Sequence, residues 1–162
     1  MAYIMRKDEM KFSANHDKMD DYIWQKSGRL SELTNAKQMD AAIVSLSPDK
    51  FSYPYHFHHN TEELFVILSG NAKLRTPDGI CEVSQGDVIF FEMGETGAHQ
   101  LYNHTNEPCV YLDMGTTTDI DLCEYPDTDK INVSGKGVGQ IHYKNQTAGY
   151  FDGEENIRDK WK

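Results

Sequence analysis

Short apolar runs separated by turn residues dominate the middle of the chain. Each run is rich in β-branched, aromatic and aliphatic residues and is closed by Gly, Pro, Asp or Asn, which is the pattern of strands that end in tight turns. The runs follow one another at intervals of about 8–12 residues, a spacing typical of a β-sandwich or β-barrel. They are AAIVSLSP, EELFVILSG, AKLRTPDG, EVSQGDVIFFEMG, AHQLYN and CVYLDMG. The sequence therefore predicts an all-β fold.

The two ends of the chain lack this pattern and predict a division into three parts. Residues 1–38 are polar and mixed, and we expect an arm with at most a short helix or irregular strand that covers an exposed sheet edge. Residues 39–118 hold the predicted strands of the barrel core. Residues 119–162 are polar again and are expected to form a C-terminal extension that packs on the barrel. Within the extension, TTTDIDLCEYPDTDK is expected to be a loop or an extended segment, and the glycines of VSGKGVGQIHYK to form a flexible turn.

Composition and charge exclude several function classes. The chain has 162 residues, enough for one compact domain, and 38% of them are apolar. Its formal net charge of −10, without a dense Lys/Arg run, argues against nucleic-acid binding and against an anionic membrane surface. The N-terminal stretch MAYIMRKDEMKF contains no apolar segment of secretory or membrane-spanning length. Cys81, Cys109 and Cys123 form no CxxC pair, so we expect free thiols and a cytoplasmic location.

The stretch HFHHNTEE, residues 56–63, concentrates histidines and carboxylates. Residues two apart on a strand point to the same face, so His56 and His58 can face inward together. A turn through HNTE would return Glu63 to their side, and two imidazoles with a carboxylate form a ligand set for Zn, Fe, Mn, Ni or Co. A fourth ligand should come from another strand that faces the same cavity, and His99 fits best. The remaining histidines fit less well: His16, His59, His104 and His142.

The same residues carry a family resemblance. The spacing His56-x-His58-x4-Glu63-x6-Gly70 matches the first motif of the cupin superfamily. The resemblance implies a double-stranded β-helix, a jelly-roll-like barrel that carries N- and C-terminal extensions in this chain. In cupins the two histidines and the glutamate of the first motif bind one divalent metal ion together with the histidine of a second motif. By position these ligands are His56, His58, Glu63 and His99, and the sequence does not distinguish Zn, Fe, Mn or Ni.

The second motif is present in a modified form. The spacing Gly86-x5-Glu92-x-Gly94-x4-His99-x3-Asn103 resembles it. Glu92 stands where proline is usual, and the gap between Gly94 and His99 is two residues longer than the usual pattern. The extra residues lie in the glycine-flanked loop GETG, where an insertion need not move His99 off its strand.

Three classes of function follow from the resemblance and stay open. The first is metal-assisted isomerisation of a small oxygen-rich molecule such as a sugar phosphate, which we place narrowly ahead. The second is a metal-dependent dioxygenase, and the third is a non-catalytic module that binds a small molecule. No catalytic residue can be assigned and no organic cofactor is expected. We also expect a homodimer, because terminal strands can extend an open sheet edge and cupins commonly dimerise in this way.

A few residues bear on the choice of substrate. An inward Arg or Lys would suit a phosphate group, and Lys73 and Arg75 share one face of the strand AKLRT, although a solvated face is the simpler interpretation. Phe65 and Ile67 share strand parity with Glu63, which predicts a partly apolar cavity. Four tyrosines could serve as acid–base groups but are more often packing residues: Tyr53, Tyr55, Tyr102 and Tyr111. Two carboxylates would repel a phosphate unless they lie on the outer surface: Glu62 and Glu92.

Overall fold

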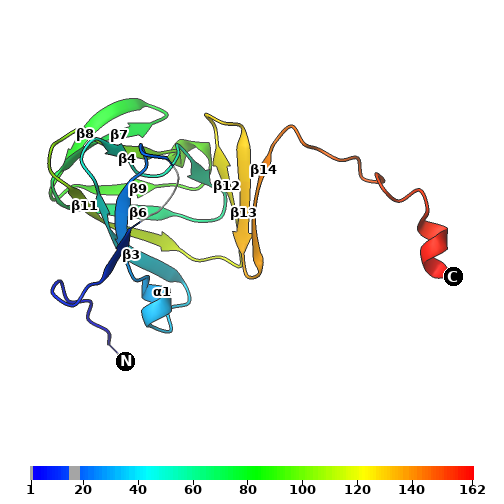
Figure 1. Ribbon diagram of the computed structural model, residues 1–162, viewed down its shortest axis with the longest axis horizontal. Helices are drawn as coiled ribbons and strands as arrows, with labels where there is room; N and C mark the ends of the chain where they lie inside the picture. The colour runs from blue at the N-terminus through cyan, green and yellow to red at the C-terminus, as the bar shows by residue number, and fades with distance from the viewer. Residues whose placement is uncertain (1, 15–18) are drawn as a thin grey trace.

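The computed structural model describes residues 2–14 and 19–162. His16, one of the histidines that fit the ligand pattern less well, lies outside the described residues. In the part of the chain that the structure describes, three antiparallel sheets account for the strands (Figure 1), which confirms the predicted all-β class. The short helices are α1 (Leu30–Leu33) and two 3-10 turns, η1 (Glu95–Gly97) and η2 (Ile157–Trp161).

The three sheets combine strands that are distant in sequence, as their spatial strand order shows. The six-stranded sheet is β1 (Phe12–Ala14), β2 (Trp24–Ser27), β3 (Met39–Leu46), β11 (Cys109–Thr116), β6 (Glu63–Ser69) and β9 (Val88–Phe91). A four-stranded sheet contains β4 (Lys50–Phe51), β10 (Gln100–Asn103), β7 (Asn71–Thr76) and β8 (Gly79–Ser84). The third sheet contains β14 (Val138–Tyr143), β13 (Lys130–Gly135), β12 (Ile120–Tyr125) and β5 (Phe57–His58).

The core lies between the first two sheets and follows the alternation of the strands. In β3 the buried residues are Ala42, Val44 and Leu46, at every second position, because successive side chains point to opposite faces. The same alternation in β6, β7 and β11 supplies further core residues, and Val83, Phe91 and Leu101 complete the cluster. Its largest buried apolar members are Leu46, Phe65, Ile67, Leu101 and Tyr111.

Gly70 joins β6 to β7 and shows why the first motif ends in glycine. Its φ is +78°, a conformation that L side chains rarely adopt. A Cβ at this position would also lie 2.5 Å from the carbonyl oxygen of Pro108. The turn that follows the ligand-bearing strand therefore depends on a residue without a side chain.

Both ends of the chain add strands beside the barrel. The arm contributes β2, which pairs with β3 and sets Trp24 opposite Leu46, so the arm covers the side of β3 that would otherwise be an open edge. The extension contributes β12, which pairs with β5 and sets Cys123 opposite His58. The segment expected as a loop or extended stretch thus contains a strand, while the expected turn lies between β13 and β14 at Gly137, where φ is +78°. After β14 the chain runs away from the sheets (Figure 1).

Among the described residues, none of the helices is long and apolar enough to cross a membrane.

Candidate metal centre and its cavity

The strand pairing brings the four predicted ligands together. His56 and His99 form an isolated antiparallel bridge, in which the amide of His99 donates to the carbonyl oxygen of His56 at 2.9 Å. His58 lies on β5 and Glu63 begins β6. The Oε2 atom of Glu63 lies 3.2 Å from Nε2 of His99 and 3.5 Å from Nε2 of His58. Ligand atoms of His56, Glu63 and His99 all lie within 4.8 Å of one another.

The other nitrogen of each imidazole has an oxygen partner. Nδ1 of His56 is 2.8 Å from the carbonyl oxygen of Pro54, and Nδ1 of His99 is 2.9 Å from that of Gly97. A carbonyl oxygen only accepts, so both Nδ1 atoms carry a proton, and in the neutral form of each ring, the form that binds a metal ion, Nε2 then presents its lone pair. Nδ1 of His58 donates in the same way to Asp121. Metal-ligating histidines characteristically donate their second nitrogen to a carbonyl or carboxylate oxygen.

This arrangement leaves electron-rich atoms facing each other. Oε2 of Glu63 and Nε2 of His99 are buried and, within the described chain, have no hydrogen-bond partner. A buried carboxylate that faces imidazole lone pairs is costly unless a cation lies between them. The donor set of three imidazoles and one carboxylate fits a divalent transition metal ion.

The electrostatics of the ligands follow from their burial and mutual contacts. Burial, with His99 nearby, lowers the pKa of His56 to about 3, which keeps this ligand neutral. Burial alone would raise the pKa of Glu63, but the neighbouring imidazoles, first of all His99, lower it to about 2. Burial would lower the pKa of His58, yet Asp121 and Glu63 together raise it above its usual value.

The lengthened loop of the second motif holds His99 in place. The imidazole of His99 stacks on Phe91 with 3.6 Å between ring centroids, and Phe65 packs edge-on against it. Gly97 closes the loop beneath it, where an added Cβ would lie 1.8 Å from the carbonyl oxygen of Glu92. The close approach of these two backbone segments requires glycine at 97, and it aims the carbonyl of Gly97 at His99.

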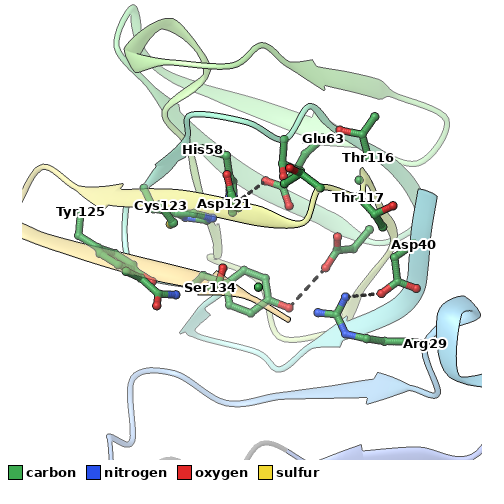
Figure 2. Close-up of a pocket in the computed structure, with 18 of the residues that line it drawn as sticks. Arg29, Asp40, His58, Glu63, Thr116, Thr117, Asp121, Cys123, Tyr125 and Ser134 are labelled. Carbon is green, nitrogen blue, oxygen red and sulfur yellow. Dashed lines mark hydrogen bonds and ion pairs between the residues drawn. The ribbon is translucent and has the colours of Figure 1, made fainter. Parts of the chain in front are cut away.

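A cavity of about 460 Å³ is lined by His56, His58 and Glu63, whereas His99 lies buried behind them and does not line it. Figure 2 shows His58 and Glu63 at this cavity, whose volume suits a small molecule. Its walls are rich in oxygen and nitrogen atoms. The lining side chains that are not predicted ligands include Arg29, Asp40, Tyr53, Thr61, Asp113, Thr116, Thr117, Thr118, Asp121, Cys123, Tyr125, Asn132 and Ser134.

One wall of the cavity comes from the C-terminal extension. Asp121, Cys123 and Tyr125 alternate along β12 and all line the cavity. On β13, Ser134 lies opposite Asp121 and Asn132 lies opposite Cys123, which extends the same polar face. Burial raises the pKa of the Cys123 thiol to about 12.

The opposite wall, shown at the lower right of Figure 2, contains Arg29 from the arm. Its Nη1 atom lies 2.7 Å from Oδ2 of Asp40. Nearby, Oδ2 of Asp113 accepts hydrogen bonds from Nζ of Lys26 at 2.9 Å and from the hydroxyl of Tyr53 at 3.4 Å. Burial raises the pKa of Tyr53 well above its usual value, so its phenol stays protonated.

The residues expected to influence substrate choice take different places. Arg75 lies outside the cavity, where it pairs with Asp127 at 2.6 Å and stacks on Tyr55. Lys73 also faces away from the core, since its neighbours Ala72 and Leu74 are the buried residues of β7. The solvated-face interpretation of this strand is therefore right.

The expectation of a partly apolar cavity is wrong for the two residues on which it rested. Phe65 and Ile67 are buried in the barrel core beneath the ligands and do not line the cavity. Tyr53 lines the cavity, whereas the other three tyrosines do not: Tyr55, Tyr102 and Tyr111. Glu62 and Glu92 are likewise absent from the lining.

The sequence analysis did not identify Arg29, Asp113 or the cavity-lining residues of β12 as part of the site. One signal was available: DIDLCEY places Asp121, Cys123 and Tyr125 at every second position, which is the spacing of one strand face. Asp113 similarly shares strand parity with the buried Tyr111. For Arg29 the local sequence carries no such signal.

Residues 42–115 match the family model described as Cupin domain. No curated protein matches the sequence.

Solved structures resemble the chain closely in fold and weakly in sequence. A sugar phosphate isomerase of the cupin superfamily from Silicibacter pomeroyi aligns with a TM-score of 0.79 at 22% identity, over 93% of this chain and 98% of that one. A candidate sugar phosphate isomerase from Acidithiobacillus ferrooxidans aligns with the same TM-score, 0.79, at 22% identity, over 90% and 95%. A predicted oxalate decarboxylase from Thermotoga maritima aligns with a TM-score of 0.60 at 20% identity, over 72% and 100%. These likenesses show the double-stranded β-helix fold.

Proposed function

We propose that this chain, whose residues 42–115 match the Cupin domain model, binds one divalent metal ion through His56, His58, Glu63 and His99. We further propose that it isomerises a small sugar-like substrate, of which a sugar phosphate is the leading candidate. The observation that carries this proposal is the convergence of three imidazole Nε2 atoms and a buried carboxylate at the base of a polar cavity. The similar structures named for sugar phosphate isomerases support the choice of substrate class.

The polar lining favours a polyhydroxylated substrate over an apolar one. Hydroxyl groups of a sugar need hydrogen-bonding partners when they leave water, and the two polar walls offer carboxylate, hydroxyl and amide groups. The dioxygenase alternative was favoured by an apolar wall, which Phe65 and Ile67 do not supply.

The cavity also accepts an anionic group, although four carboxylates line it. Asp40 is paired with Arg29, Asp113 with Lys26, and Asp121 with His58. Only Glu63 is left for the metal ion to neutralise. Arg29 uses Nη1 for Asp40, and its other donors suit a phosphate or carboxylate of the substrate.

Bound at this site, a divalent ion would act as a Lewis acid on a substrate carbonyl oxygen. We assign proton transfer to Asp113. Lys26 and Tyr53 both bind its Oδ2 atom, while among the described residues Oδ1 receives no hydrogen bond. Asp113 would accept the proton from the hydroxyl-bearing carbon beside the carbonyl and return it to the former carbonyl carbon, while the hydroxyl proton passes to the former carbonyl oxygen; together these transfers interconvert aldose and ketose.

Metal content tests the first half of the proposal. Untagged protein should hold one divalent ion per chain, and His58→Ala should lose it. His59→Ala is the matched control, because His59 is the exposed neighbour that contacts Glu124. Full stoichiometric metal at unchanged affinity in His58→Ala would show that the site assignment is wrong.

Activity tests the second half. The same metal-loaded protein should interconvert aldose and ketose forms within a panel of sugar phosphates, and Asp113→Asn should abolish turnover while metal content is kept. Oxygen uptake that depends on iron and on a diketone or catechol would favour the dioxygenase instead. Ligand binding without turnover in either assay would favour a binding module.

We also propose a homodimer. The outer face of the six-stranded sheet is apolar where Leu68, Val88 and Phe90 are exposed, and β9 is an open edge of that sheet. Light scattering at micromolar concentration should give twice the mass of one chain, and Phe90→Lys should reduce it. Ile141→Lys, an exposed apolar position on β14, is the control. A monomer mass for the unmodified protein contradicts the proposal.

The three free cysteines agree with the predicted cytoplasmic location.

A further inference from the structure

We propose that Cys123 is a further ligand of the metal ion, contributed to the centre by the C-terminal extension. The proposal goes beyond the three histidines and the glutamate of the barrel, and it rests on the metal site proposed above. The ligand atoms of His56, His58 and Cys123 lie within 4.8 Å of one another, so they form a second group that shares His56 with the first. Nitrogen and sulfur ligands of one tetrahedral zinc ion lie about 3.6 Å apart, and about 4.4 Å is the greatest separation that the two bond lengths allow.

Backbone pairing fixes this proximity. Cys123 of β12 lies directly opposite His58 of β5 in an antiparallel ladder. Side chains of directly opposite residues project on the same face with their Cβ atoms about 5 Å apart. The thiol therefore remains beside the imidazole of His58 for as long as the extension pairs with the barrel.

The surroundings of Cys123 distinguish it from the other two cysteines. Cys123 is buried at the wall of the cavity, next to polar ligands. Cys109 belongs to the apolar core cluster, and Cys81 is exposed on β8. Cys123 alone of the three lies in the group of residues that could hold an ion.

A thiolate ligand changes which metal the site prefers. On binding, the S–H bond of Cys123 breaks, the proton leaves to water and a sulfur–metal bond forms. Soft sulfur favours ions such as Zn²⁺ over Mg²⁺ and Mn²⁺, which prefer oxygen ligands. The extension would thus add to the preference for Zn²⁺ that the imidazole ligands already give the barrel site.

Cobalt substitution tests the proposal, because Co²⁺ reports on its ligands by absorption. With Co²⁺ loaded, the unmodified protein and Cys81→Ser should both show the near-ultraviolet band of sulfur-to-cobalt charge transfer together with visible ligand-field bands. Cys123→Ser should lose the charge-transfer band and keep the visible bands, since the nitrogen and carboxylate ligands remain. A Co²⁺-loaded unmodified protein with visible bands alone overturns the assignment of Cys123.

A competition between metals provides a second readout that does not require a spectrum. The ratio of Zn²⁺ to Mn²⁺ affinity should fall in Cys123→Ser and in Cys123→Ala and should stay unchanged in Cys81→Ser. An unchanged ratio in the folded Cys123 variants contradicts the proposal. If the unmodified protein shows neither type of cobalt band and binds none of these ions, the metal site itself is wrong, and that result is distinct from failure of the cysteine ligand alone.

Discussion

The cavity has two kinds of wall, and they differ in how they are held. The wall from the barrel contains Glu63, which contacts the buried His99, and His99 is fixed by packing against Phe65 and Phe91, residues of the buried core. The walls from the two chain ends are fixed by strand pairing at the margin of the barrel, through Trp24 on one side and Cys123 on the other. Under the proposals above, the barrel supplies the histidine and glutamate ligands, and the chain ends supply the residues that select substrate and metal.

The largest difference between the two regions should appear in stability. Phe65→Ala should lower the free energy of unfolding by about 3–5 kcal/mol, because it leaves a cavity in the core beneath His99. Val133→Ala, on the half-buried β13, should cost less than about 1.5 kcal/mol. Urea unfolding of the metal-free proteins measures both values, and equal costs would remove the distinction between a rigid barrel and a marginal wall.

Asp121 connects the two regions, since it belongs to the extension and orients a ligand of the barrel. Asp121→Asn should weaken metal binding by about 10–100-fold, the usual cost of losing a carboxylate that holds a ligating histidine. Asp119→Asn is the control, because Asp119 is exposed and contacts only Lys136 as an ion pair among the described residues. Metal titration of both variants decides whether the extension contributes to the centre.

Substitutions of Arg29 and Arg75 compare the contribution of the arm to substrate binding with that of the outer face of the barrel. Arg29→Met should raise the KM for an anionic substrate about tenfold, equivalent to about 1.4 kcal/mol of lost binding. Arg75→Met should leave KM unchanged, because Arg75 lies outside the cavity and pairs with Asp127. Steady-state kinetics with phosphorylated and unphosphorylated sugars separates the charge effect from a general loss of activity.

The smallest expected effect is the pH dependence around His58, whose pKa is raised in the metal-free protein. The His58 imidazolium beside Asp121 stabilises the metal-free fold below pH about 6.5, the unperturbed value, and this stability is lost as the pH rises through the raised pKa. Metal must displace the same proton, so metal affinity should rise over that window, by at most about tenfold per pH unit.

Unfolding and metal titrations across pH 5–8 (roughly the range in which histidine titrates) should therefore show opposite slopes. Asp121→Asn should reduce both slopes, because one of the two carboxylates that raise the pKa of His58 is gone while Glu63 remains. Parallel slopes in the unmodified protein would contradict this role for the extension.

The sequence by itself determined the all-β class and the four candidate ligands. These features are local or periodic: His56 and His58 are two apart, Glu63 follows one turn later, and His99 occupies an inward strand position. Strand parity correctly grouped residues that share one face of a strand, such as Lys73 and Arg75, but did not show which face lines the cavity. Gly70 marked the turn, at which the backbone has a positive φ.

Only the tertiary structure decided which residues line the cavity opposite the predicted ligands. Parity states which face a residue occupies but not which strand becomes its neighbour, and the pairing of β12 with β5 joins Cys123 to His58 across a long separation in sequence. The same reason explains why Arg75 was considered for the cavity and Arg29 was not: the arm places Arg29 at the site through the pairing of β2 with β3 and its ion pair with Asp40. These long-range contacts are set by the packing of the whole chain, and no single stretch of the sequence encodes them.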